Sequence, residues 1–120
     1  MSTTSITPRV VSGSSNGRGI LVAATATPGT TIHTATSTST ELDEVTLYAN
    51  NSHSVDILLT IELGGTTNPD DLVQVTIPAQ SGWNRVVCGH RLAGGVVVRA
   101  FAGTTNKISI FGEVNRIVTA

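Results

Sequence analysis

The feature that most constrains this chain is an alternation of apolar and polar residues, which recurs in short segments between residues 43 and 118. In the first of these segments Val45, Leu47 and Ala49 occupy every second position. Two later segments repeat the pattern, with apolar residues at Val55, Ile57, Leu59, Ile61 and Leu63 and at Val73, Val75 and Ile77. A period of two places alternate side chains on one face of a β-strand. The sequence therefore predicts short strands with one buried face, and no helix.

Clusters of Gly, Pro, Asn, Asp and Ser separate these segments, as expected for turns between strands. We expect strands at residues 20–27, 31–36, 43–50, 55–63, 72–77, 84–88, 96–102 and 107–112, with 114–118 extending the last one. About eight strands at this spacing are typical of an all-β, antiparallel sandwich or jelly roll. We therefore expect one domain, a β-sandwich (jelly roll) over residues 19–120, because 120 residues suffice for a single core.

Residues 1–18 differ from the rest because Ser, Thr, Gly and Asn dominate them. Such a composition predicts a flexible, extended N-terminal arm in isolation. Ile6, Val10 and Val11 are its sizeable apolar residues, and a disordered tail needs none of them. Two hypotheses remain open: the arm becomes ordered on a neighbouring molecule, or it is a mobile terminus.

Charged residues make up 12% of the chain, against roughly a quarter in ordinary soluble domains. The net charge of −1 provides no field that would attract nucleic acid or an anionic membrane. Four apolar residues fall on the outward sides of their expected strands: Leu58, Leu72, Val97 and Phe101. We therefore expect other subunits to cover much of the surface.

Cys88 is the only cysteine, so the chain forms no internal disulfide and does not depend on an oxidising compartment. The first residues lack the basic and apolar segments of a signal peptide, and no apolar run is long enough to span a membrane. These features predict synthesis in a cytoplasm.

Reactive side chains are sparse and poorly grouped, so we expect no catalytic residue, no cofactor and no metal site. His33, His53 and His90 have no ligand spacing, and lone histidines are mostly solvated. Cys88 follows an apolar run, which favours a buried, inert thiol. Residues 68–71 offer too few oxygen atoms for Ca²⁺ and favour a turn. The carboxylates that glycoside hydrolysis would require are expected at solvated strand positions: Glu44, Glu62 and Glu113.

Trp83 is the only tryptophan, and it follows Ser81 and Gly82 in a loop. Three interpretations remain open. Trp83 is an anchor in a partner's pocket, a stacking platform for a sugar ring, or a lid over the end of the sandwich.

Residues 41–118 resemble small structural proteins of tailed-phage virions. The strings that carry the resemblance are 43–50 (DEVTLYAN), 59–67 (LTIELGGTT), 68–72 (NPDDL), 75–82 (VTIPAQSG), 96–102 (VVVRAFA) and 110–117 (IFGEVNRI). These strings are structural and contain no catalytic signature. They are most similar to head decoration (cement) proteins, and less so to tail or fibre components.

The resemblance implies a non-enzymatic jelly-roll homotrimer that binds between capsomers of the major capsid protein and stabilises the head. The implied location is the head surface of the virion, after synthesis in the bacterial host. We expect the arm to contact capsid protein or a neighbouring protomer through Ile6, Pro8, Arg9, Val10 and Val11. The alternative is a tail or fibre-tip domain that binds host surface glycan, with Trp83 at the site.

Overall fold

The computed structural model describes residues 4–119, which contain nine β-strands and no helix. No helix of these residues could therefore cross a membrane. The strands are β1 (Thr4–Val10), β2 (Ile20–Leu21), β3 (Thr30–Thr34), β4 (Glu41–Asn51), β5 (Ile57–Leu63), β6 (Leu72–Ile77), β7 (Asn84–Leu92), β8 (Val97–Ala102) and β9 (Ile108–Thr119).

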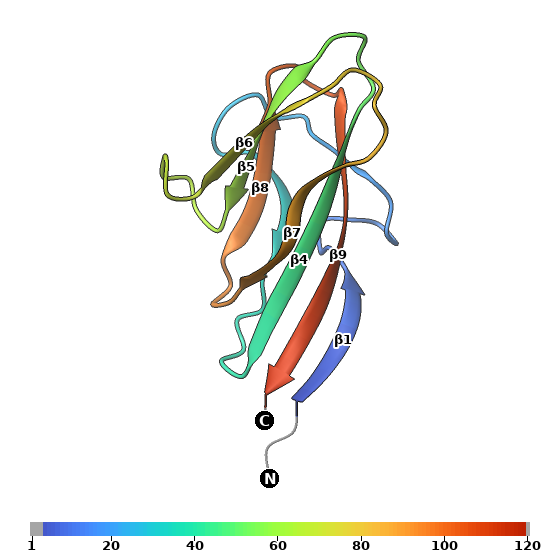
Figure 1. Cartoon of the computed structure of the whole chain (residues 1–120). Helices are drawn as coiled ribbons and strands as arrows, with labels where there is room; N and C mark the ends of the chain where they lie inside the picture. The colour runs from blue at the N-terminus through green and yellow to red at the C-terminus, as the bar shows by residue number, and fades with distance from the viewer. Residues whose placement is uncertain (1–3, 120) are drawn as a thin grey trace.

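The strands form two antiparallel sheets packed face to face, as Figure 1 shows. Sheet A has the order β1-β9-β4-β7, and β2 pairs with β9 outside this path. Sheet B has the order β3-β8-β5-β6. β4 and β9 are the longest strands and pair over eleven positions, from Glu41 opposite Val118 to Asn51 opposite Ile108. The molecule is elongated along this pair and measures 55 × 27 × 20 Å.

The core between the sheets consists of aliphatic side chains, as the alternation predicts. Sheet A contributes Val45, Leu47 and Ala49 from β4, and sheet B contributes Leu59 and Ile61 from β5; all five are fully buried. Each buried Val, Leu or Ile side chain stabilises the folded state by about 1.5–3 kcal/mol relative to its exposed form. Among residues 4–119, no aromatic side chain belongs to this core. The aromatic side chains therefore lie outside the core.

The predicted all-β sandwich is confirmed, and so are most of its strands. The strand at residues 72–77 has the predicted bounds. The strands at 55–63 and 96–102 differ by one or two residues at their first end, and the one at 43–50 is longer by two residues at its start and one at its end. The predicted strand at 84–88 is longer in the structure and extends to Leu92, whereas the one at 31–36 spans residues 30–34. The prediction that residues 114–118 extend the last strand is confirmed, because β9 continues to Thr119.

The prediction of a strand over residues 20–27 is wrong beyond Leu21. The backbone N–H of Val22 donates to Ile108 O in sheet A, whereas Ala24 O accepts from the N–H of Ala102 in sheet B. This segment crosses from one sheet to the other, so it cannot continue as a strand in either ladder. Residues 22–29 instead form an irregular connection to β3, with bends at residues 25–28.

The N-terminal segment contains a strand that the sequence pattern did not predict. β1 pairs with β9 over its whole length, from Thr4 opposite Thr119 to Val10 opposite Glu113. The next residue, Val11, is only 1% exposed and belongs to the core. The structure therefore does not confirm a free arm over residues 1–18, since the described part of this segment is attached to sheet A.

Candidate functional site

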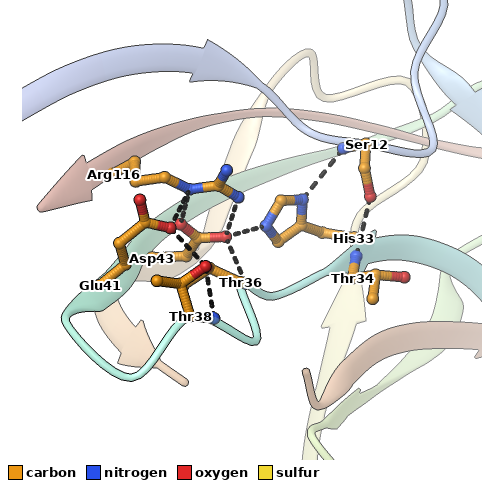
Figure 2. A network of polar contacts seen from close by, with 8 residues as sticks. All are labelled: Ser12, His33, Thr34, Thr36, Thr38, Glu41, Asp43 and Arg116. Carbon is orange, nitrogen blue, oxygen red and sulfur yellow. Dashed lines mark hydrogen bonds and ion pairs between the residues drawn. The ribbon is translucent and has the colours of Figure 1, made fainter. Parts of the chain in front are cut away.

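A buried polar network connects four segments of the sandwich near the start of β4 and the end of β9 (Figure 2). Its centre is the fully buried carboxylate of Asp43 in β4. Arg116 of β9 donates to this carboxylate from Nε to Oδ1 (2.8 Å) and from Nη2 to Oδ2 (3.0 Å). Oδ2 also accepts from the Thr36 backbone N–H (3.1 Å) and contacts His33 Nε2 (2.8 Å). Asp43 therefore accepts four hydrogen bonds, which compensate for its burial.

The hydrogen bonds of His33 define its tautomer. The backbone N–H of Ser12 points at His33 Nδ1 over 3.0 Å, and an amide N–H can only donate. Nδ1 therefore accepts, and the ring proton lies on Nε2, which donates to Asp43. The neutral imidazole links the loop after β1 to strands β3 and β4.

The pKa of Asp43 reflects this environment. Burial by itself raises the pKa, but hydrogen bonds from Arg116, His33 and the Thr36 backbone outweigh it and lower the pKa from 3.8 to about 2. In return, the hydrogen bond to Asp43 raises the pKa of the Arg116 guanidinium. The folded state therefore favours the ionised carboxylate, and this preference stabilises the fold.

We expect acid to remove this stabilisation in a defined pH window. Because the folded-state pKa lies below the unfolded value, the contribution is complete above about pH 4 and disappears as the pH falls towards 2. The loss amounts to about 2 kcal/mol. Urea unfolding of the wild type and D43N between pH 5 and pH 2 measures it, because the other carboxylates cancel in the difference. A difference that does not change with pH would contradict this assignment.

The prediction that His33 is solvated is wrong, because it is a β3 residue that is almost fully buried. Ser12, His33 and Asp43 are the residue types of a hydrolytic triad, but their geometry is different. Ser12 contacts the imidazole through its backbone N–H, and its Oγ accepts from the N–H of Thr34 (2.8 Å). Both ring nitrogens are thus engaged by groups that hold the ring in place. The network holds the strands together, and its arrangement does not activate the Ser12 hydroxyl.

A second buried carboxylate holds the loop before β3 against sheet B. Glu62 in β5 accepts from the Thr27 hydroxyl at Oε2 (2.6 Å) and from the Gly29 N–H at Oε1 (2.7 Å). The prediction that Glu62 occupies a solvated position is therefore wrong, because this loop covers it. The loop packs so closely that a Cβ on Gly29 would lie 2.5 Å from the backbone oxygen of Ala100.

Aromatic residues gather on the outer face of sheet A and form what we call the aromatic shelf: Tyr48, Trp83 and Phe111. Tyr48 and Phe111 lie opposite each other on β4 and β9. The Trp83 indole stacks on Tyr48, with centroids 5.1 Å apart and planes at 26°, and contacts Phe111 at 5.2 Å and 42°. Trp83 is nevertheless 63% exposed. Trp83 therefore lies on the outer face of sheet A and does not form a lid over the end of the sandwich, and the interpretations as an anchor or a stacking platform stay open.

The predicted contact residues of the N-terminal segment occupy three environments. Ile6, Pro8 and Val10 are exposed on one face of β1, and Arg9 is exposed on the other. Val11 is in the core, away from this surface. Ile6 lies directly opposite Ile117 of β9, which in turn lies opposite Leu42 of β4. We call this part of sheet A, comprising β1 with residues 113–119 and 41–44, the terminal ladder.

The remaining predicted sites have simple environments. Cys88 is exposed, so the prediction of a buried thiol is wrong. In the turn at residues 68–71, the Asp71 carboxylate accepts from the Thr67 N–H (3.0 Å), as expected for a turn. Among residues 4–119, no three His, Cys, Asp or Glu side chains are grouped closely enough to hold a metal ion.

Comparison with known proteins adds no identification, since no protein-family model and no curated protein matches this chain. The function must therefore be inferred from the surfaces described above.

Proposed function

We propose that this chain is a non-enzymatic structural protein of a phage virion, a head decoration (cement) protein. In this proposal a homotrimer binds between capsomers of the major capsid protein and stabilises the head by adhesion. The observation that carries the proposal is the terminal ladder, where a strand exposed along its whole length presents apolar side chains at the edge of a sheet. The resemblance of residues 41–118 to phage structural proteins supports the same function.

The terminal ladder has the properties of an association surface. Ile6, Ile117 and Leu42 form a continuous apolar row across three strands, and Ile6 is 61% exposed. An exposed apolar edge strand is a liability for a protein that remains alone. Pro8 removes one amide N–H from β1, so the strand cannot offer a complete ladder to another strand. We therefore assign adhesion to the side-chain face of the ladder.

The strand order supports a jelly-roll assignment. Apart from the short β2, eight strands divide into two four-stranded sheets of order β1-β9-β4-β7 and β3-β8-β5-β6. Strands distant in the chain are neighbours in both sheets, as in two nested Greek keys. In this topology the first and last strands pair, which places the terminal ladder at one end of the sandwich (Figure 1).

The mechanism requires only many weak contacts that act together. A trimer presents three copies of the terminal ladder, and the binding of one copy raises the effective concentration of the others at the capsid surface. The low charge of the chain, 12% of residues, limits electrostatic repulsion between neighbouring copies. Each trimer would bridge capsomers and so oppose their separation under internal DNA pressure.

The double substitution I6S/V10S tests the proposal. Both side chains are exposed, so we expect the fold to be retained while binding to capsid shells weakens at least tenfold, which corresponds to about 1.4 kcal/mol. Co-sedimentation with shells of the virus's own major capsid protein measures the binding. A deletion of residues 1–18 is a poorer test, because it also removes Val11 from the core.

L58S is the matched control, because Leu58 is also apolar and exposed but lies in sheet B. It should co-sediment like the wild type. If I6S/V10S also binds like the wild type, the terminal ladder is not the adhesive surface.

A further inference from the structure

Three of the four aromatic residues of this chain lie together outside the core, in the aromatic shelf. Buried aromatic side chains normally contribute greatly to a core, yet this core is aliphatic. The indole of Trp83 rests on the rings of Tyr48 and Phe111, which restrict its orientation while most of its surface remains in solvent. Such a preorganised aromatic surface is suited to binding, because little conformational entropy is lost when a ligand stacks on it.

Two cavities adjoin the shelf and meet at Phe111. One has a volume of about 320 Å³ and lies against Trp83, Tyr48 and Glu113. The other has a volume of about 470 Å³ and lies against Arg18, Ser15 and Ser109. Both volumes fall in the range of small-ligand sites. One cavity is therefore mainly aromatic and the other mainly polar.

Glycines line both cavities. Gly17 and Gly112 line the aromatic cavity, and Gly13 and Gly19 line the polar one. A Cβ on Gly19 would lie 2.7 Å from the Phe111 ring, so the loop before β2 approaches the shelf as closely as only glycine allows.

We propose that the aromatic shelf and its two cavities bind a saccharide chain. One pyranose ring stacks its C–H face on the Trp83 indole, with its hydroxyls directed towards Glu113. The next sugar ring passes Phe111 and enters the polar cavity, where Arg18, Ser15 and Ser109 meet its hydroxyls. A pyranose has an apolar face and a polar rim. The aromatic cavity matches the apolar face, and the polar groups of the two cavities match the hydroxyls of the rim.

The charges at the site favour a saccharide over nucleic acid, whose bases also stack on aromatic rings. Single-strand binding sites add a positively charged groove that follows the phosphates. Here Arg18 and Glu113 contribute one charge of each sign, and the chain carries a net charge of −1. Saccharide hydroxyls accept hydrogen bonds from a guanidinium and donate them to a carboxylate, so both charges contribute to binding.

The site meets the terminal ladder at Glu113, which lines the aromatic cavity and lies opposite Val10 of β1. The other residues that line the two cavities lie outside the ladder, so this inference goes beyond decoration. Phe111, at the centre of the site, and Ile117, in the apolar row of the ladder, are six residues apart on β9, which is about 20 Å at ~3.3 Å per residue. Saccharide binding and adhesion to a capsid can therefore be tested separately, with substitutions at Trp83 and at Ile6.

Because Trp83 is the only tryptophan, its fluorescence reports on the site without a label. We would titrate the full chain with cellohexaose, chitohexaose and an alginate hexamer. Concentrations up to about 10 mM would nearly saturate even a weak site with a Kd of ~1 mM. We expect saturable quenching or a spectral shift with at least one of them. F111A should weaken this response at least tenfold, whereas L58S should leave it unchanged.

W83A provides a second test that does not depend on F111A folding, because the Trp83 side chain is mostly exposed. Calorimetry should show that W83A no longer binds the saccharide, while it still co-sediments with capsid shells. The proposal would be overturned if none of the three saccharides binds or if W83A binds as well as the wild type. It would also be overturned if oligothymidylate binds more tightly than any saccharide, or if Trp83 emission shows burial on self-association of the chain.

Discussion

Replacing Asp43 by alanine is expected to lower the free energy of unfolding by about 3–5 kcal/mol. The variant removes the acceptor of four hydrogen bonds and leaves the Arg116 guanidinium without its buried partner. An uncompensated charge at a buried site costs far more than the pair contributes. Chemical unfolding followed by circular dichroism measures the change.

E44A is the matched control, because Glu44 is the next residue of the same strand and points to the opposite face. Its ion pair with Arg91 is longer (3.4 Å), and the Arg91 side chain is 63% exposed, so the loss of the pair should cost at most about 1 kcal/mol. Equal losses for D43A and E44A would show that the network does not stabilise the strands in the way described.

The second large effect is expected at Glu62. E62A removes two short hydrogen bonds to a charged acceptor, and we expect a loss of about 3 kcal/mol, since such bonds contribute roughly 1.5–3 kcal/mol each. The loop before β3 should also lose protection in amide hydrogen exchange, and the Gly29 N–H should show this most directly, because the Glu62 carboxylate accepts from it.

E113A is the control for this substitution, because Glu113 is also a strand carboxylate but is exposed. It should change the unfolding free energy by no more than about 0.5 kcal/mol. If E62A is as mild as E113A, or if the loop keeps its protection, Glu62 does not hold the loop.

The fold class could be predicted from local pattern because its core strands are buried on one face. In β4 the inward positions Val45, Leu47 and Ala49 alternate with half-buried outward positions, and this is the signal that a period of two detects. The pairing of β4 with β9 joins residues about seventy apart in the chain, and no local pattern encodes it.

β1 was missed for a physical reason. All seven of its residues are exposed, so it has no buried face and no alternation to detect. Its strand conformation depends on backbone hydrogen bonds to β9, which lies at the other end of the chain. At residues 22–27 the opposite error occurs, because a strand was predicted where none forms. The apolar run there resembles a strand, but the segment crosses from one sheet to the other.

The buried polar residues show which parts of the site can be predicted from the sequence. Asp43 falls at an inward position of β4, two residues before Val45 and on the same face as Val45 and Leu47. This alternation alone could have indicated a buried carboxylate with hydrogen-bond partners. His33 and Arg116 complete the network from other strands, and nothing in the local sequence relates them to Asp43. Glu62 gave no such signal, because a loop covers it on the outward face.

The aromatic shelf illustrates the same limit. Trp83 was identified as a candidate anchor or stacking platform because it is the only tryptophan and lies in a loop. Its partners Tyr48 and Phe111 come together only because β4 and β9 pair in this register. Trp83 could thus be identified from the sequence, whereas the aromatic shelf to which it belongs could not.

The measurement that tests the central claim most directly is gold-antibody labelling of intact virions, viewed by electron microscopy. Decoration of the head predicts label distributed over the whole capsid surface and absent from the tail. Label confined to the tail or its tip would contradict the proposal, and the aromatic shelf would then become the candidate receptor-binding surface of a tail or fibre protein.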